Sequence, residues 1–196
     1  MGQYYKPINL DKKQWVSSHE YDNGLKLMEH SWIGNTFVSV VENLIAAGGA
    51  WCGDRIVWAG DYADEEKGRK NNLYTIIGTD KNKIKPGVIK RNFRYVVNLD
   101  TEEFVDTKKV PLSDVYTDDK GKEWPFQMHP LPILTCEGNG RGGGDFRKDD
   151  VMVGIWARHR VTVSKTKPKG YTEIEFNVFE GEYPKKMTKK QKPVSV

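Results

Sequence analysis

Apolar and polar residues alternate in several short stretches of the chain, which predicts a fold rich in strands. In the clearest stretch, Ile174, Phe176 and Val178 alternate with polar residues, as in a strand that has one face in water. The other predicted strands are short and are bounded by turn-forming residues. Together the predicted strands cover residues 4–9, 15–16, 56–59, 73–77, 95–99, 103–105, 151–163 and 171–179.

One stretch has helical periodicity instead. Apolar residues between Phe37 and Ile45 recur at the spacing of a single helix face. Asn35 or Thr36 can cap the start of this helix, and Gly48-Gly49 follows its end. We therefore predict a helix over about residues 36–47, and a shorter one over residues 25–30. Together with the strands, these helices indicate an α+β, strand-dominated fold class.

A short pattern occurs twice in the same order, which predicts an internally duplicated chain. Residues 8–16 (INLDKKQWV) align without a gap on residues 97–105 (VNLDTEEFV). Further along, Gly49, Trp51 and Arg55 recur with the same spacing as Gly154, Trp156 and Arg160. The chain is therefore interpreted as two pseudo-symmetric halves.

The charge distribution sets the expected boundaries of these halves. Residues 67–94 contain nine basic residues and one acidic residue, whereas residues 1–66 and 95–183 each carry a net negative charge. We predict one compact domain over residues 1–183, in which the basic segment joins the two halves. The lysine-rich residues 184–196 contain few apolar anchors and are predicted to be a disordered tail.

Composition places the chain among cytoplasmic globular proteins. Hydrophobic residues make up 37% of the chain and charged residues 30%, and no apolar stretch is long enough to span a membrane. The N-terminus lacks the apolar core of a signal peptide, and the only cysteines are Cys52 and Cys136. We expect a reducing cytoplasm, either bacterial or that of a host.

The basic segment from Lys67 to Arg94 is the first candidate for binding. Clustered cations attract nucleic acid, and the lysine-rich tail could contribute in the same way. The alternative is a solvated loop and strand face.

The loop over residues 137–145 (EGNGRGGGD) is the second candidate. Glycines let a backbone approach a ligand closely, and consecutive N–H groups can surround an anion. The candidate contacts are Asn139, Gly142 and Gly143, with Arg141 as a possible bidentate partner of a phosphate. A strand rather than a helix is predicted after this loop, so a dinucleotide fingerprint is not indicated. The alternative is a connector without a ligand.

The duplicated tryptophan–arginine pairs are the third candidate. Trp51 with Arg55, and Trp156 with Arg160, could stack a base and hold a phosphate across a shared cleft. The alternative is a core tryptophan beside an arginine held by a local carboxylate such as Asp54.

No catalytic or metal-binding motif is recognisable, so we predict no metal site and no cofactor. Residues 60–66 form an acidic loop whose spacing does not match a calcium loop. None of the four histidines lies in a known metal motif, and His129 is only a weak acid–base candidate.

Several motifs together resemble a family of uncharacterised bacterial and phage proteins. They are the opening MGQYY with NLD, residues 51–62, residues 138–145 and residues 156–160. The resemblance spans most of the chain except the basic segment and the tail. It implies a bacterial or viral setting and assigns no residue a role.

The leading hypothesis is a non-enzymatic protein that binds a small anionic ligand, such as a nucleotide or a signal derived from one. A phage protein of this kind could sequester a defence signal of its host. One alternative is a metal-assisted enzyme acting on a nucleotide or phosphoester, with His129 as acid or base and Asp61 or Asp145 at the metal. Another alternative is an inhibitor that binds protein or nucleic acid through the basic segment.

Overall fold

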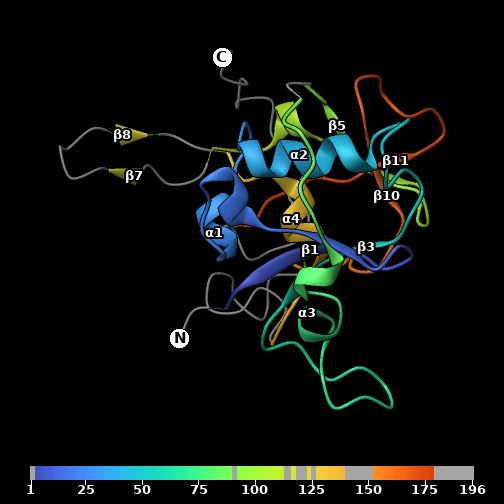
Figure 1. Ribbon diagram of the computed structural model, residues 1–196. Coiled ribbons are helices and arrows are strands. Elements are labelled where there is room, and N and C mark those ends of the chain that lie inside the picture. The colour runs from blue at the N-terminus through green and yellow to red at the C-terminus, as the bar shows by residue number, and fades with distance from the viewer. Residues whose placement is uncertain are drawn as a thin grey trace.

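The computed structural model describes residues 3–89, 92–112, 116–117, 123–124, 127–139 and 152–178. Within these residues the protein is α+β and strand-dominated, with two mixed sheets as its framework (Figure 1). None of the helices in the described part of the chain is long and apolar enough to cross a membrane.

The first sheet has five strands in the order β4-β2-β1-β3-β9. They are β1 (Tyr5–Asn9), β2 (Gln14–Val16), β3 (Ile56–Gly60), β4 (Lys83–Ile84) and β9 (Cys136–Glu137). β1 pairs antiparallel with both β2 and β3, whereas the short edge strands β4 and β9 pair parallel with their neighbours.

The second sheet has four strands in the order β10-β5-β6-β11. They are β5 (Tyr95–Asn98), β6 (Glu103–Asp106), β10 (Val161–Ser164) and β11 (Thr172–Glu173). β5 pairs antiparallel with β6 and β10, and β11 pairs parallel with β6. A separate ribbon consists of β7 (Tyr116–Thr117) and β8 (Glu123–Trp124).

The helices are short, apart from one. They are α1 (Leu27–His30), α2 (Thr36–Ile45), α3 (Leu73–Ile76) and α4 (Pro130–Thr135), with 3-10 turns η1 (Ser18–Tyr21), η2 (Asp80–Asn82) and η3 (Thr107–Lys109). α2 confirms the predicted helix, although it ends two residues earlier. Its cap is Asn35, whose side chain accepts a hydrogen bond of 3.2 Å from the backbone N–H of Val38.

Three predicted strands differ from the structure. Residues 73–77 form the helical turn α3, because Asn72 caps it by accepting the N–H of Thr75 at 3.1 Å. Within the predicted strand 151–163, residues 152–158 are turns and only the end belongs to β10. Within 171–179, regular pairing is limited to β11. The alternation there reflects Ile174 and Phe176 facing the core without a full ladder.

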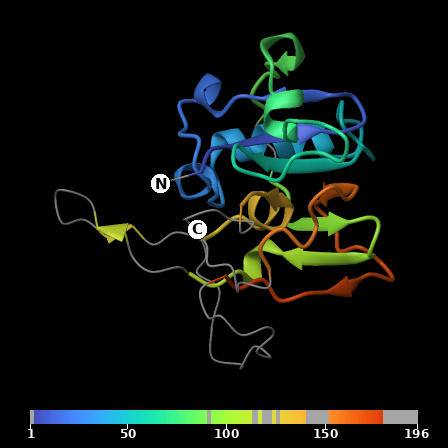
Figure 2. The ribbon, with the colours of Figure 1, turned by 90° about the horizontal axis from the view of Figure 1, so that it is seen from below.

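The two sheets lie in separate parts of the molecule, one above the other in Figure 2, and four strands of each share one topology. In the first, a hairpin (β1, β2) receives β3 beside its first strand and β4 beside its second. In the second, the hairpin (β5, β6) receives β10 and β11 at the same places and in the same directions. That both halves derive from one duplicated unit stays a prediction, and this shared topology agrees with it.

Two of the helices pack against a strand of the other half. α2, which follows the first hairpin, packs on β10 of the second sheet, and α4, which follows the second hairpin, packs on β3 of the first sheet. The hydroxyl of Thr162 in β10 donates a hydrogen bond of 2.8 Å to the carbonyl of Ile45 at the end of α2. The largest apolar cluster therefore draws residues from both halves. α2 and α4 therefore tie the two halves together through a shared core.

A neutral histidine lies in this core. His30 is fully buried; its Nδ1 lies 3.1 Å from the carbonyl of Gly24, and its Nε2 lies 3.0 Å from the indole nitrogen of Trp58. Since the indole can only donate, Nε2 must accept and Nδ1 must carry the proton. Burial lowers the pKa of His30 from 6.5 to about 4.

We expect this histidine to make the protein less stable in mild acid. Between pH 6.5 and 4 the unfolded chain binds a proton at His30 that the folded protein rejects, so stability falls as the pH falls through this window. From pH 7.5 to pH 5 the free energy of unfolding should drop by about 2 kcal/mol through this residue. Urea unfolding of the wild type and of His30→Gln at both pH values measures the effect. Equal losses in the two proteins would contradict it.

Candidate functional site

The duplicated Asn-Leu-Asp sequence forms the same turn in both hairpins. The side-chain oxygen of Asn9 accepts hydrogen bonds from the backbone N–H groups of Asp11 and Lys12, at 3.0 and 2.8 Å. The oxygen of Asn98 accepts from Asp100 and Thr101, at 2.9 and 3.2 Å. Both asparagines are fully buried. They hold the turn, so that the aspartate two residues later projects from it.

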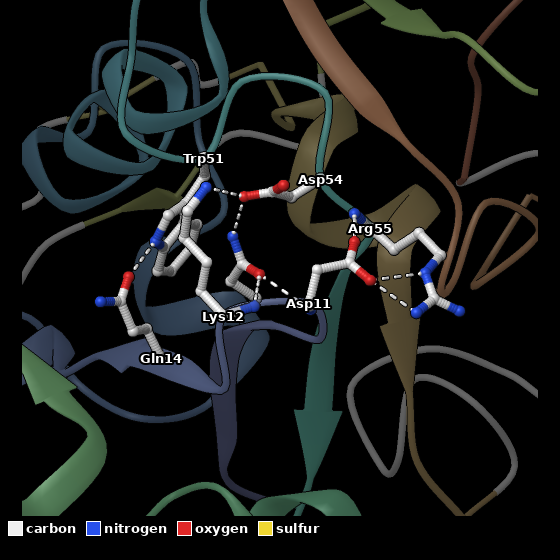
Figure 3. A network of polar contacts seen from close by, with 7 residues as sticks. Asp11, Lys12, Gln14, Trp51, Asp54 and Arg55 are labelled. Atoms are coloured by element: carbon white, nitrogen blue, oxygen red, sulfur yellow. Dashed lines mark hydrogen bonds and ion pairs between the residues drawn. The ribbon is translucent and has the colours of Figure 1, made fainter.

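Each of these aspartates binds an arginine that directly precedes a strand, Arg55 before β3 and Arg160 before β10. Asp11 accepts the backbone N–H of Arg55 at 2.7 Å, and its other oxygen accepts Nε and Nη2 at 3.0 and 2.6 Å (Figure 3). Asp100 accepts the backbone N–H of Arg160 at 2.8 Å and its Nε at 2.6 Å. These hydrogen bonds lower the pKa of both aspartates.

The two arginines lie beside each other across the boundary between the sheets. Arg55 and Arg160 form an isolated antiparallel bridge, flanked by backbone hydrogen bonds from Ile56 to His159 (3.0 Å) and from Arg158 to Ile56 (2.9 Å). Residues opposite each other in an antiparallel pair project their side chains from the same face. We call Asp11, Arg55, Asp100 and Arg160 the arginine seam.

The arginine seam is open to water. The arginine side chains are 55% and 52% exposed. Asp11 occupies Nε and Nη2 of Arg55, and Asp100 occupies only Nε of Arg160. Within the described residues, no other side chain binds the remaining N–H groups of these guanidiniums. The seam can therefore offer hydrogen-bond donors to a ligand from solvent.

The tryptophans of the repeated pairs lie in the core, which corrects the prediction that they stack on a ligand. Trp51 and Trp156 are 0% and 1% exposed. The indole of Trp51 donates a hydrogen bond of 2.9 Å to Gln14, and that of Trp156 donates one of 3.0 Å to Glu103. Neither ring has a free face for a base, so the alternative of core tryptophans describes the structure.

Arg55 is held by Asp11 and not by Asp54, the carboxylate suggested from the sequence. Asp54 accepts a hydrogen bond of 2.7 Å from the side chain of Asn9 and pairs with Lys12, while Asp11 holds the arginine (Figure 3). In the second half, His159 takes the place of Asp54 and lies 2.8 Å from the side-chain nitrogen of Asn98. The two turns therefore share a plan but differ in charge.

The glycine-rich loop is described only at its start. Arg141, Gly142 and Gly143 lie outside the described residues, whereas Asn139 is described and exposed. The loop leaves β9 in close contact with the end of β3: a Cβ on Gly60 would lie 3.1 Å from the Cα of Gly138. The structure therefore places Asn139 at the end of β3 opposite to Arg55.

A network that the sequence analysis missed ties this loop to the acidic loop. Arg158 donates to both oxygens of Glu137 at 2.6 Å and also binds Glu66. These hydrogen bonds raise the pKa of Arg158, and those that it donates to Glu137 have the largest effect. Arg158 adopts a left-handed backbone with φ of 68°, which is uncommon outside glycine. Gly53, at the matching place in the first half, has φ of 77°. The glycine at position 53 was therefore the sequence feature that could have indicated a left-handed backbone at the matching position 158.

The candidate residues His129, Lys83 and Lys85 make their contacts away from the arginine seam. His129 is buried: its Nδ1 accepts the backbone N–H of Leu131 at 3.1 Å, and its Nε2 lies 3.2 Å from Glu42. In the basic segment, Lys83 and Lys85 pair with Glu20. Among the described residues, no group of three or more histidine, cysteine or acidic side chains could hold a metal ion.

No family model, curated protein or solved structure matches this chain. The resemblance to bacterial and phage proteins stays a prediction, and any functional assignment rests on the geometry of the site.

We expect the left-handed backbone of Arg158 to separate two substitutions. Arg158→Ala and Arg158→Gly remove the same ion pairs, but only glycine adopts this conformation without steric cost. The glycine variant should therefore be more stable than the alanine variant by about 1 kcal/mol. Urea unfolding of both variants beside the wild type measures the difference. An alanine variant as stable as the glycine variant, or more so, would show that the backbone there is unstrained.

Proposed function

We propose that the protein binds a small anionic ligand at the arginine seam. The observation that carries the proposal is the bridge between Arg55 and Arg160, which brings two exposed guanidiniums onto one face. Guanidinium groups recognise phosphate and carboxylate through paired N–H donors.

The two aspartates support this proposal by fixing the arginines in place. Asp11 and Asp100 each bind the backbone and the side chain of one arginine, so less side-chain entropy is lost when a ligand binds. They also offset the charge of the arginines, so the four residues of the seam carry no net charge. We therefore expect binding through oriented hydrogen bonds, with a moderate affinity that weakens as salt is added.

Binding is favoured over catalysis because the residues that an enzyme would need have other contacts. Both ring nitrogens of His129 face partners inside the core, and the side chain of Asp61 accepts the backbone N–H of Tyr4 at 3.0 Å. Asp145 lies outside the described residues. A protein that binds an anion without converting it would store or sequester that anion, as the phage hypothesis requires.

Removal of both seam arginines should abolish ligand binding while the fold persists. Each guanidinium donates charge-assisted hydrogen bonds to the ligand, so each single alanine variant should bind roughly tenfold more weakly. Isothermal titration with pyrophosphate, ATP and ADP measures the affinities of the wild type, Arg55→Ala, Arg160→Ala and the double variant. The same affinity in the double variant as in the wild type would contradict the proposal.

Arg94→Ala is the matched control for these variants. Arg94, which directly precedes β5, also pairs with an aspartate, Asp106. The side chain of Arg94 is 43% exposed. Its loss should leave ligand affinity unchanged, although it should cost more stability than the seam variants because Asp106 is only 3% exposed. Wild-type protein that binds no compound of the panel would equally count against a seam for anions.

A further inference from the structure

We infer that the arginine seam recognises a diphosphate group, with one phosphate on each arginine, and that it does not read a nucleobase. The inference rests on the proposed function and names the class of ligand at the same site. Three properties of the seam carry it: its local symmetry, the separate anchoring of its cations and the lack of an aromatic platform among the described residues around it.

The two halves of the seam share most of their contacts, apart from the additional hydrogen bond from Nη2 of Arg55 to Asp11. In each half the aspartate of the turn binds the backbone N–H and the Nε of its arginine through different oxygens. The carbonyls of Arg55 and Arg160 also accept equivalent hydrogen bonds of 2.9 Å from Leu10 and Leu99. Because an antiparallel bridge is itself a local two-fold arrangement, the two arginines extend from backbone positions related by the same axis. The matching ligand has two equivalent anionic groups.

Each cation is anchored to its own half. Asp11 belongs to the turn between β1 and β2, and Asp100 to the turn between β5 and β6, so the two carboxylates hold the arginines from opposite sides of the boundary. Each arginine is thus held by its own carboxylate and presents its remaining N–H groups separately. A diphosphate can contact both arginines while each stays bound to its aspartate.

The charge balance of the seam favours the same ligand. Each arginine is neutralised by its aspartate, so an ion that meets only one pair gains little from net charge. A ligand that bridges both pairs gains hydrogen bonds from two oriented guanidiniums at the cost of immobilising a single molecule.

No exposed tryptophan, tyrosine or phenylalanine of the described residues lies at the seam, and the partly exposed imidazole of His159 beside Arg160 is held by Asn98. Trp51 and Trp156 are buried with their indole N–H groups satisfied. Among the described residues, the exposed tyrosines are Tyr4 and Tyr62, which flank the end of β3 that lies away from Arg55. Five to six residues of extended chain separate that end from Arg55, a distance of roughly 16–20 Å. Pyrophosphate and a nucleoside diphosphate should therefore bind alike.

Titration of the full chain with phosphate, pyrophosphate and ADP tests the inference. Pyrophosphate should bind about tenfold or more tightly than phosphate, because it engages the second arginine. ADP should match pyrophosphate within about threefold, since no ring contacts the adenine. Arg55→Ala and Arg160→Ala should each lose the preference for pyrophosphate over phosphate, and to the same extent. Arg94→Ala should keep it.

The possible failures are distinct. Phosphate and pyrophosphate binding equally well, with affinity lost in the double variant, would overturn the diphosphate inference and leave an anion site. ADP binding more than about tenfold tighter than pyrophosphate would overturn the claim that no base is read. Loss of the preference in only one of the two single variants would overturn the two-fold arrangement. No binding of any of the three would remove the proposed function itself.

Discussion

The antiparallel bridge between Arg55 and Arg160 joins the two sheets at the edge of the apolar core that they share. Beside this bridge the two halves exchange backbone hydrogen bonds, Ile56 with His159 and Arg158 with Ile56. The helices reinforce the same junction, since α2 packs on β10 and α4 packs on β3. The two small sheets thereby share the largest apolar cluster of the described residues.

The turns give this junction its chemistry. In both hairpins a buried asparagine bonds the backbone of the turn, and the following aspartate binds an arginine across the strand. A buried amide that satisfies its own turn leaves the aspartate free to act on a neighbour. The pattern N-L-D therefore positions two exposed arginines, although its residues have an ordinary structural reason to be there.

The sequence indicated these features because their causes are local. Helical spacing and the cap at Asn35 identified α2, and the repeated N-L-D sequence marked the equivalent positions that form the two turns. The equal spacing of the two tryptophan–arginine pairs also suggested that Arg55 and Arg160 contribute to one shared site.

Features with long-range causes were harder to predict. Whether Trp51 and Trp156 would be core or site depended on packing between distant segments, which no single sequence reveals. α3 was missed because apolar runs of four or five residues fit a strand or a helix, and only the cap at Asn72 distinguishes them. The network of Arg158 was missed because its partners, Glu66 and Glu137, are distant in sequence.

The most direct test of an anion site between the halves is a crystal structure of the wild-type protein with tungstate, a phosphate analogue that scatters anomalously. We predict an anomalous peak within hydrogen-bonding reach of the guanidinium of Arg55 or Arg160, while both arginines remain bound to Asp11 and Asp100. Tungstate bound elsewhere on the protein with an empty seam, or arginines displaced from their aspartates, would contradict this prediction.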